Sequence, residues 1–173
     1  MLELNRISAG YGKQTVLDGI SVDFEKGKLT SIIGVNGCGK STLLKAILGI
    51  LSLSSGEIFI DGENLLTISR NEIAKKIAYL SQGKNIPDMT VEQMVLHGRF
   101  PYLSYPRRYS SHDREVAIKA MEIVGVAEFA HKPLYSLSGG MRQNAYIAMA
   151  LAQDTDYILL DEPTTYLDIA HQL

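Results

Sequence analysis

The stretch Gly34–Thr42 reads Gly-Val-Asn-Gly-Cys-Gly-Lys-Ser-Thr and fills the spacing G-x-x-x-x-G-K-[ST]. An apolar run at 29–33 precedes it and predicts a buried strand, and apolar residues follow it at helical spacing. A helix that begins in a glycine loop points unpaired backbone N–H groups and the positive end of its dipole at one spot, which makes an anion site. Lys40 adds a charge for the outer phosphates, and the Ser41 hydroxyl suits Mg²⁺. The stretch therefore predicts a nucleotide site rather than a glycine turn that only caps a helix.

A second glycine pattern overlaps the same stretch. Gly37 and Gly39 begin the dinucleotide fingerprint G-x-G-x-x-G, but Thr42 stands where the third glycine or alanine belongs. That fingerprint also has no use for Lys40. We therefore reject the dinucleotide interpretation.

Composition narrows the class of protein. The chain has 173 residues, 46% hydrophobic and 21% charged, which predicts one soluble globular domain with enough apolar content for a core. Its net charge of −2 argues against a general nucleic-acid binder. It has no apolar run of about 18 residues and no secretory pattern. The single cysteine, Cys38, fits a reducing cytosol, and a small residue filling a tight loop is favoured there over a reactive thiol.

Hydrophobic patterns outline an α/β chain. Strands are predicted at 2–8, 20–24, 57–60, 77–80 and 157–160, and helices at 111–124 and 139–152. Capping-box pairs at Ser69/Glu72 and Thr90/Gln93 predict the starts of two further helices, and Gly98 is expected to close the second.

Polar residues at the ends of predicted strands are site candidates. Asp161 and Glu162 follow strand 157–160, and we expect Asp161 to hold Mg²⁺ and Glu162 to polarise the attacking water. Gln82 follows strand 77–80, where it either orients a water, touches Mg²⁺ or is a plain loop residue. Tyr11 is either a half-buried aromatic or a stacking surface for adenine.

Two further segments have residue patterns typical of binding surfaces. Ser138, Gly139 and Gly140 open the predicted helix 139–152 and repeat the anion-site logic, which makes sense if this second site faces another subunit's nucleotide. Segment 99–109 is basic and aromatic, with two prolines that exclude a long regular element. A solvated loop or a protein-docking surface is favoured there over a reader of single-stranded nucleic acid.

Taken together, these motifs resemble the ATP-binding cassette (ABC) ATPases. The order is the glycine loop, Gln82, Leu-Ser-Gly-Gly-Met at 137–141 and Tyr-Ile-Leu-Leu-Asp-Glu at 157–162, and the resemblance covers essentially the whole chain. It implies that Tyr11 stacks on adenine, that the Gln82 loop couples the nucleotide to a partner and that Asp168 lies in a loop by which two copies communicate. It assigns ATP and Mg²⁺ contacts to Gly34, Asn36, Gly37, Cys38, Gly39, Lys40, Ser41 and Thr42, with Ser41, Gln82 and Asp161 on the metal and Glu162 and Gln82 as catalytic residues.

The resemblance also implies partners. Ser138, Gly139 and Gly140 would contact the γ-phosphate of an ATP held by a second copy, in a head-to-tail dimer that closes over two ATPs. Gly-Arg-Phe-Pro-Tyr at 98–102 and the run from Asp161 to Gln172 are similar to importer ATPases for ferric siderophores, haem and cobalamin, with ferric siderophores most similar. The implied partners are an integral-membrane permease and, indirectly, an extracytoplasmic substrate-binding protein, with segment 99–109 as a candidate rim of the docking surface. No nucleic acid is implied, and the implied location is cytoplasmic, peripheral on the inner face of the cell membrane.

Three features depart from the family pattern. Met141 replaces a glutamine, and Asn144 stands where a second arginine is usual. The chain stops at Leu173, and His171 follows the Asp168 loop too closely to be the family's switch histidine. The strand missing after it normally lies between the glycine-loop strand and the Asp161 strand, so two apolar edges would be exposed. We hypothesise a truncated chain that at most binds nucleotide and hydrolyses it poorly.

The sequence thus predicts an α/β fold of the P-loop NTPase type, with a mainly parallel core sheet, an antiparallel β subdomain and a helical subdomain. The expected organisation is one ABC-type nucleotide-binding domain over 1–173, incomplete at its C-terminus, with the core at 1–87 and 153–173 and the helical subdomain at 88–152. The expected function is ATP hydrolysis coupled to uptake of a ferric siderophore or similar iron complex. Two alternatives stay open: a soluble ABC-type ATPase acting on ribosomes or iron–sulfur assembly, and a remnant that binds nucleotide without hydrolysing it.

Overall fold

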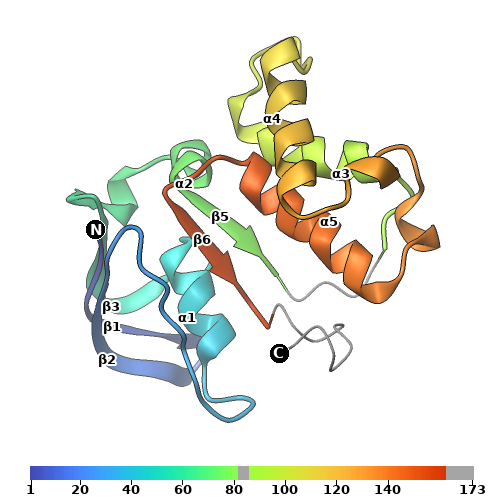
Figure 1. Ribbon diagram of the computed structural model, residues 1–173. Helices are drawn as coiled ribbons and strands as arrows, with labels where there is room; N and C mark the ends of the chain where they lie inside the picture. Colours follow the sequence, from blue (N-terminus) through green and yellow to red (C-terminus); the bar gives the residue numbers. More distant parts are fainter. Residues whose placement is uncertain (82–85, 163–173) are drawn as a thin grey trace. The chain divides into compact units, whose positions relative to one another are not determined.

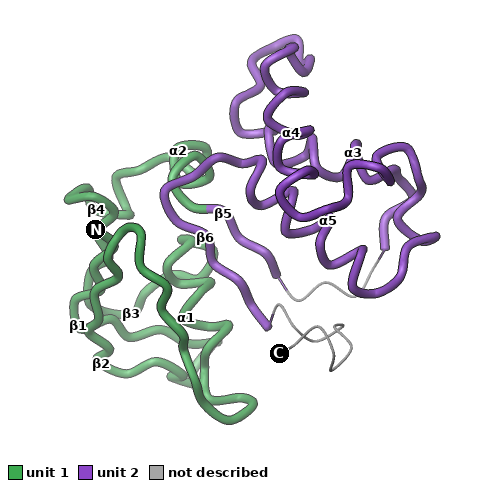
Figure 2. Tube along the Cα trace, in the orientation of Figure 1, with its two compact units in different colours: residues 1–77 green, residues 78–173 purple. Residues whose placement is uncertain are grey.

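The computed structural model describes residues 1–81 and 86–162. It divides into two compact units, residues 1–77 and residues 78–173, which Figure 2 shows in different colours. Each unit is described by itself. Within the described ranges, no helix is long and apolar enough to cross a bilayer.

Unit 1 is built on an antiparallel sheet. Its strands are β1 (Leu2–Tyr11), β2 (Gln14–Phe24), β3 (Leu53–Ile60) and β4 (Glu63–Asn64), in the order β2-β1-β3-β4. Leu4 and Ile7 of β1 face the core and have no exposed surface, and the alternation of the strand shifts by one residue at an irregularity between them. Asp61 and Gly62 both have positive φ, 54° and 82°, and form the tight turn between β3 and β4. The expected antiparallel portion is confirmed, and its strands are longer than the sequence pattern suggested.

Helix α1 (Lys40–Ile47) begins at the glycine loop and buries one face in unit 1. Its buried residues include Leu43, Leu44 and Ile47, as their helical spacing predicts. Gly49 follows the helix with φ 65°, the left-handed conformation that ends many helices. The short helices η1 (Leu65–Thr67) and α2 (Arg70–Lys76) complete the unit, and Ser69 caps α2 by accepting from the backbone N–H of Glu72 at 3.2 Å.

The buried strand expected at 29–33 is wrong. The structure assigns no strand there, and Leu29 and Ile33 are 97% and 93% exposed. An apolar run becomes a strand only when a neighbouring strand satisfies its backbone N–H and C=O groups. Neither sheet in the described ranges includes residues 29–33, so this segment lacks the hydrogen-bonding neighbour that the apolar pattern presupposes.

Unit 2 combines a pair of strands with a group of helices. Strands β5 (Ile77–Leu80) and β6 (Tyr157–Leu160) lie side by side, and their arrows point the same way (Figure 1), so the pair is parallel. The helices are α3 (Val91–Leu96), η2 (His97–Tyr102), α4 (Ser111–Ile123), η3 (Ala127–Phe129), η4 (Leu134–Ser136) and α5 (Gly139–Ala152). Helices α3, α4 and α5 share a core that contains Val91, Val95 and Ala148, none of which has exposed surface. The predicted bounds of β5, α5 and β6 are confirmed.

The start of α3 is confirmed but its end is not where the sequence placed it. Thr90 and Gln93 form both bonds of the predicted capping box. Gly98 does not close the helix, because the chain continues directly into η2. A Cβ on Gly98 would collide with the backbone carbonyl of Met149 in α5, so the glycine is needed for close packing of η2 against α5.

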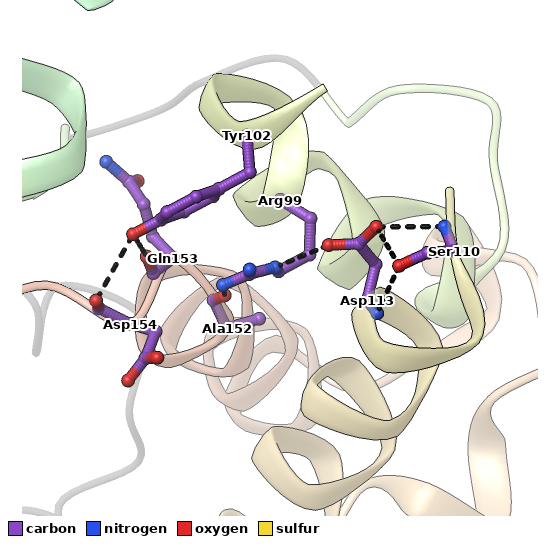
Figure 3. A network of polar contacts seen from close by, with 7 residues as sticks. All are labelled: Arg99, Tyr102, Ser110, Asp113, Ala152, Gln153 and Asp154. Carbon is purple, nitrogen blue, oxygen red and sulfur yellow. Dashed lines mark hydrogen bonds and ion pairs between the residues drawn. The ribbon is translucent and has the colours of Figure 1, made fainter. Parts of the chain in front are cut away.

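Arg99 joins three elements of unit 2 through a buried polar network (Figure 3). Its Nε donates to Asp113 Oδ1 at 3.0 Å, and its Nη1 donates to the carbonyl of Ala152, the last residue of α5, also at 3.0 Å. Asp113 in turn accepts through Oδ2 from the backbone N–H of Ser110 at 2.9 Å and from its hydroxyl at 2.7 Å, at the start of α4. The Tyr102 ring centroid lies 4.0 Å from the guanidinium carbon. Segment 97–102 is therefore fastened to the start of α4 and to the end of α5.

Burial alone would raise the pKa of Asp113. The hydrogen bonds from Ser110 and the bond and charge of Arg99 outweigh burial and hold the pKa of this carboxyl below its ordinary value of 3.8. Asp113 is therefore charged at neutral pH even though only 7% of the residue is exposed.

Candidate nucleotide-binding site

The glycine loop takes backbone conformations that a side chain would disturb. Gly37 and Gly39 have φ values of 82° and 103°, in the left-handed region that L-residues rarely adopt. A Cβ on Gly34 would lie 2.6 Å from Cys38 Sγ, and one on Gly39 would lie 3.1 Å from a methyl group of Val16 in β2. The loop is thus folded tightly on itself and against β2.

The Lys40 side chain folds back onto the glycine loop. Its ammonium donates to the backbone carbonyls of Gly34 at 2.9 Å and Val35 at 3.1 Å. These carbonyls carry only partial negative charge, so an anionic phosphate is a stronger acceptor for the same ammonium. The geometry places the lysine charge at the loop, where the motif predicts it.

The other loop residues differ in exposure. Asn36, Gly37 and Cys38 are exposed, and Cys38 is a free thiol. Ser41 is half-buried in the first turn of α1, and Thr42 is buried. Ser41 therefore keeps part of its surface open to solvent beside Lys40, as a phosphate or cation ligand requires.

Tyr11 ends β1 and is 50% exposed. The ammonium of Lys45 in α1 lies 6.0 Å from the centroid of the Tyr11 ring, at the outer limit of a cation–π contact. The half-exposed ring agrees with both sequence interpretations, the half-buried aromatic and the adenine platform.

The carboxylate predicted to hold Mg²⁺, Asp161, and the one predicted to polarise water, Glu162, lie in unit 2 directly after β6. Asp161 is buried, and its backbone N–H donates to the carbonyl of Leu80 in β5 at 2.9 Å. The hydroxyl of Tyr79 donates to Asp161 Oδ2 at 3.2 Å. Glu162 is exposed and has a positive φ of 51°, a sparsely populated conformation for a residue with a side chain. Sequence reasoning missed Tyr79, because an aromatic residue inside an apolar strand is typical of core packing.

The second candidate anion site lies at the start of α5. The Ser138 side chain caps the helix by accepting from the backbone N–H of Met141 at 3.3 Å, and Ser138 is exposed while Gly139 and Gly140 are half-buried. Gln82 and Asp168 lie outside the described residues.

Met141 and Asn144, the two residues of α5 that depart from the pattern noted in the sequence, both make contacts within unit 2. Met141 packs against the shared core of α3, α4 and α5. Asn144 donates from Nδ2 to the carbonyl of Val124 at 3.1 Å, just beyond the end of α4. Both residues therefore fasten α5 within unit 2.

A family model matches the part of the chain that contains both the glycine loop and the two carboxylates. Residues 17–165 match the family model described as ABC transporter. The chain belongs to this family. The resemblance inferred from the motifs is confirmed, and so is the fold class.

Individual relatives of this ABC cassette are import proteins. The chain is 44% identical over 173 residues to the Petrobactin import ATP-binding protein FpuD of Bacillus anthracis, covering 99% of this chain and 63% of the relative. It is also 44% identical to the Iron(3+)-hydroxamate import ATP-binding protein FhuC of Bacillus subtilis (strain 168), covering 99% of this chain and 64% of the relative. The chain thus spans less than two thirds of the length of these curated relatives.

Solved structures show the same fold. An ABC transporter in an inward-facing conformation aligns with a TM-score of 0.84 at 33% identity, over 99% of this chain and 64% of that one. The dimeric structure of MJ0796, a bacterial ABC transporter cassette, aligns with a TM-score of 0.82 at 28% identity, over 99% of this chain and 78% of that one.

Proposed function

We propose that this ABC cassette is the ATP-binding subunit of an importer for a ferric siderophore or similar iron complex. The observation that carries the proposal is the glycine loop with Lys40 held at its mouth, in a chain that is 44% identical to two import ATP-binding proteins whose names specify petrobactin and iron(3+)-hydroxamate. In this function the chain binds ATP and its hydrolysis drives uptake.

The residues available suit Mg-ATP. Backbone N–H groups of residues 34–42, the Lys40 ammonium and the positive start of α1 meet the phosphates. The Ser41 hydroxyl and the Asp161 carboxylate are hard oxygen ligands of the kind that Mg²⁺ prefers, and Mg²⁺ neutralises phosphate charge. Glu162 orients and polarises the attacking water, and Tyr11 stacks on adenine. Catalysis consists mainly of positioning and charge stabilisation.

In the proposed head-to-tail dimer, each copy contributes residues to the nucleotide site of the other copy. Ser138, Gly139 and Gly140 face the ATP of a second copy, because a second anion site in one chain is otherwise redundant. The Gln82 loop couples the nucleotide to a partner, and Asp168 belongs to the loop by which the two copies communicate. The partners are a membrane permease and, through it, an extracytoplasmic binding protein, which places the cassette on the cytoplasmic face of the membrane. Segment 99–109, in which Tyr105 is 97% exposed while Arg99 is buried, is a candidate rim for permease docking.

Glu162→Gln is expected to separate binding from hydrolysis. Loss of the general base should slow phosphate release about 10²- to 10⁴-fold, while Mg-ATP affinity should change less than about twofold because the phosphate ligands remain. Single-turnover phosphate release from labelled ATP measures the first quantity and calorimetry the second. Glu115→Gln, an exposed carboxylate on α4, is the matched control.

The import role is tested by complementation. A bacterial strain that lacks the ATP-binding subunit of its ferric hydroxamate importer is expected to regain uptake of radioactive iron with the wild-type chain and not with Glu162→Gln. A wild-type chain that binds ATP but restores no uptake would contradict the importer function and favour the remnant that only binds nucleotide.

A further inference from the structure

Tyr79 places a phenol against the carboxylate that the proposed function assigns to the metal. It lies in β5, next to β6, and its hydroxyl donates to Asp161 Oδ2 at 3.2 Å. The other three residues of β5 are buried apolar side chains, whereas Tyr79 is half-buried. Its hydroxyl therefore lies beside the Asp161 carboxylate, just past the end of β6.

Asp161 is held within unit 2 at its backbone and at one carboxylate oxygen. The backbone N–H of Asp161 bonds to the carbonyl of Leu80 at 2.9 Å, which fixes where the side chain starts. The Tyr79 hydroxyl then bonds to one of the two carboxylate oxygens, which fixes how the group is turned. Because the residue is anchored at its backbone and one carboxylate oxygen accepts from Tyr79, rotation of the side chain is restricted, and less entropy is lost on binding a cation.

We propose that Tyr79 is a positioning residue for Asp161 and that it sets the affinity for the divalent cation that accompanies ATP. The inference rests on the proposed function, because it takes Asp161 as a metal ligand. Hydrogen-bonded partners of metal ligands orient the ligand, and their loss typically weakens metal binding about 10- to 100-fold. In this proposal Tyr79 acts on the cation through Asp161.

The test uses Tyr79→Phe, which removes one hydroxyl and keeps the ring in the sheet. Mn²⁺ replaces Mg²⁺, and free Mn²⁺ is measured by electron paramagnetic resonance in the presence of a non-hydrolysable ATP analogue. Tyr79→Phe is expected to weaken Mn²⁺ binding about 10-fold, while binding of the analogue in EDTA stays unchanged. Tyr135→Phe removes the same atom from a tyrosine of η4 that is 63% exposed, and it is expected to match wild type.

A double-mutant cycle with Asp161→Asn distinguishes a failure of the role given to Tyr79 from a failure of the metal site given to Asp161. If Tyr79 acts through Asp161, Tyr79→Phe should have no added effect on Mn²⁺ in the Asp161→Asn background. Wild-type Mn²⁺ affinity in Tyr79→Phe, together with weakened affinity in Asp161→Asn, would overturn the role of Tyr79 alone. Unchanged Mn²⁺ affinity in Asp161→Asn would overturn the metal site of the proposed function. An equal effect of Tyr79→Phe in both backgrounds would show that the hydroxyl acts on the fold and not on Asp161.

Discussion

Replacing Arg99 by methionine is expected to lower the free energy of unfolding by about 3–5 kcal/mol, because it leaves the Asp113 carboxylate buried without its cation. The side chains of Arg99 and Asp113 are only 5% and 9% exposed, so water cannot take the place of the guanidinium without rearrangement. The carbonyl of Ala152 loses its donor in the same variant. Urea unfolding followed by far-ultraviolet circular dichroism measures the effect.

Two variants show whether the buried charge is the cause. Adding Asp113→Asn to Arg99→Met should recover part of the loss, since asparagine is neutral and its side-chain oxygen still accepts from Ser110. Arg114→Met removes an arginine whose side chain is 55% exposed and lies 3.6 Å from Glu92, and it should cost less than about 1 kcal/mol. Equal losses in Arg99→Met and Arg114→Met would contradict the network.

The same pair gives stability a defined pH dependence. Because the pKa of Asp113 is lowered below 3.8 in the folded state, the unfolded chain binds its proton more readily than the folded one. The stabilisation of the folded state by charged Asp113 is therefore complete above the pKa of Asp113 in the unfolded chain. It is lost as pH falls through the pKa of Asp113 in the folded chain. In Arg99→Met this acid-dependent loss should shrink.

Replacing Lys40 by alanine is expected to weaken Mg-ATP binding about 10- to 100-fold, which corresponds to the loss of a charge-assisted bond of about 1.5–3 kcal/mol. The ammonium now bonded to the carbonyls of Gly34 and Val35 is the group that would transfer to the outer phosphates. Binding should be measured by calorimetry with ATP and with AMP.

AMP distinguishes a phosphate contact from damage to the loop. AMP has no outer phosphates, so Lys40→Ala should change its affinity little. Lys75→Ala removes a lysine of α2 that pairs with Glu72 at 2.8 Å, and it should leave ATP affinity unchanged. Parallel losses for ATP and AMP in Lys40→Ala would mean that the variant disrupts the loop.

The sequence predicted those parts of the fold that depend on local patterns. The bounds of α5 at 139–152 and β6 at 157–160 follow from periodicity and from the serine cap, and the structure has them unchanged. The strand expected at 29–33 failed because pairing is a long-range property that an apolar run does not encode. In the described ranges, no neighbouring strand lies beside it.

The site shows the same division. Lys40, Ser41 and Asp161 could be predicted as site residues because each belongs to a motif with fixed spacing. Tyr79 was missed because its contact with Asp161 joins residues 82 positions apart. Arg99 was noted only as part of a basic, aromatic segment, and nothing in its spacing indicated the bond to Asp113. Contacts of this kind depend on how strands and helices pack, which the motifs do not specify.

A calorimetric titration of the wild-type chain with Mg-ATP and, separately, with AMP tests the proposed nucleotide site most directly. We expect saturable binding of one Mg-ATP per chain and affinity for AMP at least about 10-fold weaker, because the loop and Lys40 recognise the outer phosphates. No saturable binding of Mg-ATP, or equal affinity for AMP, would contradict the assignment of residues 34–42 as the nucleotide site.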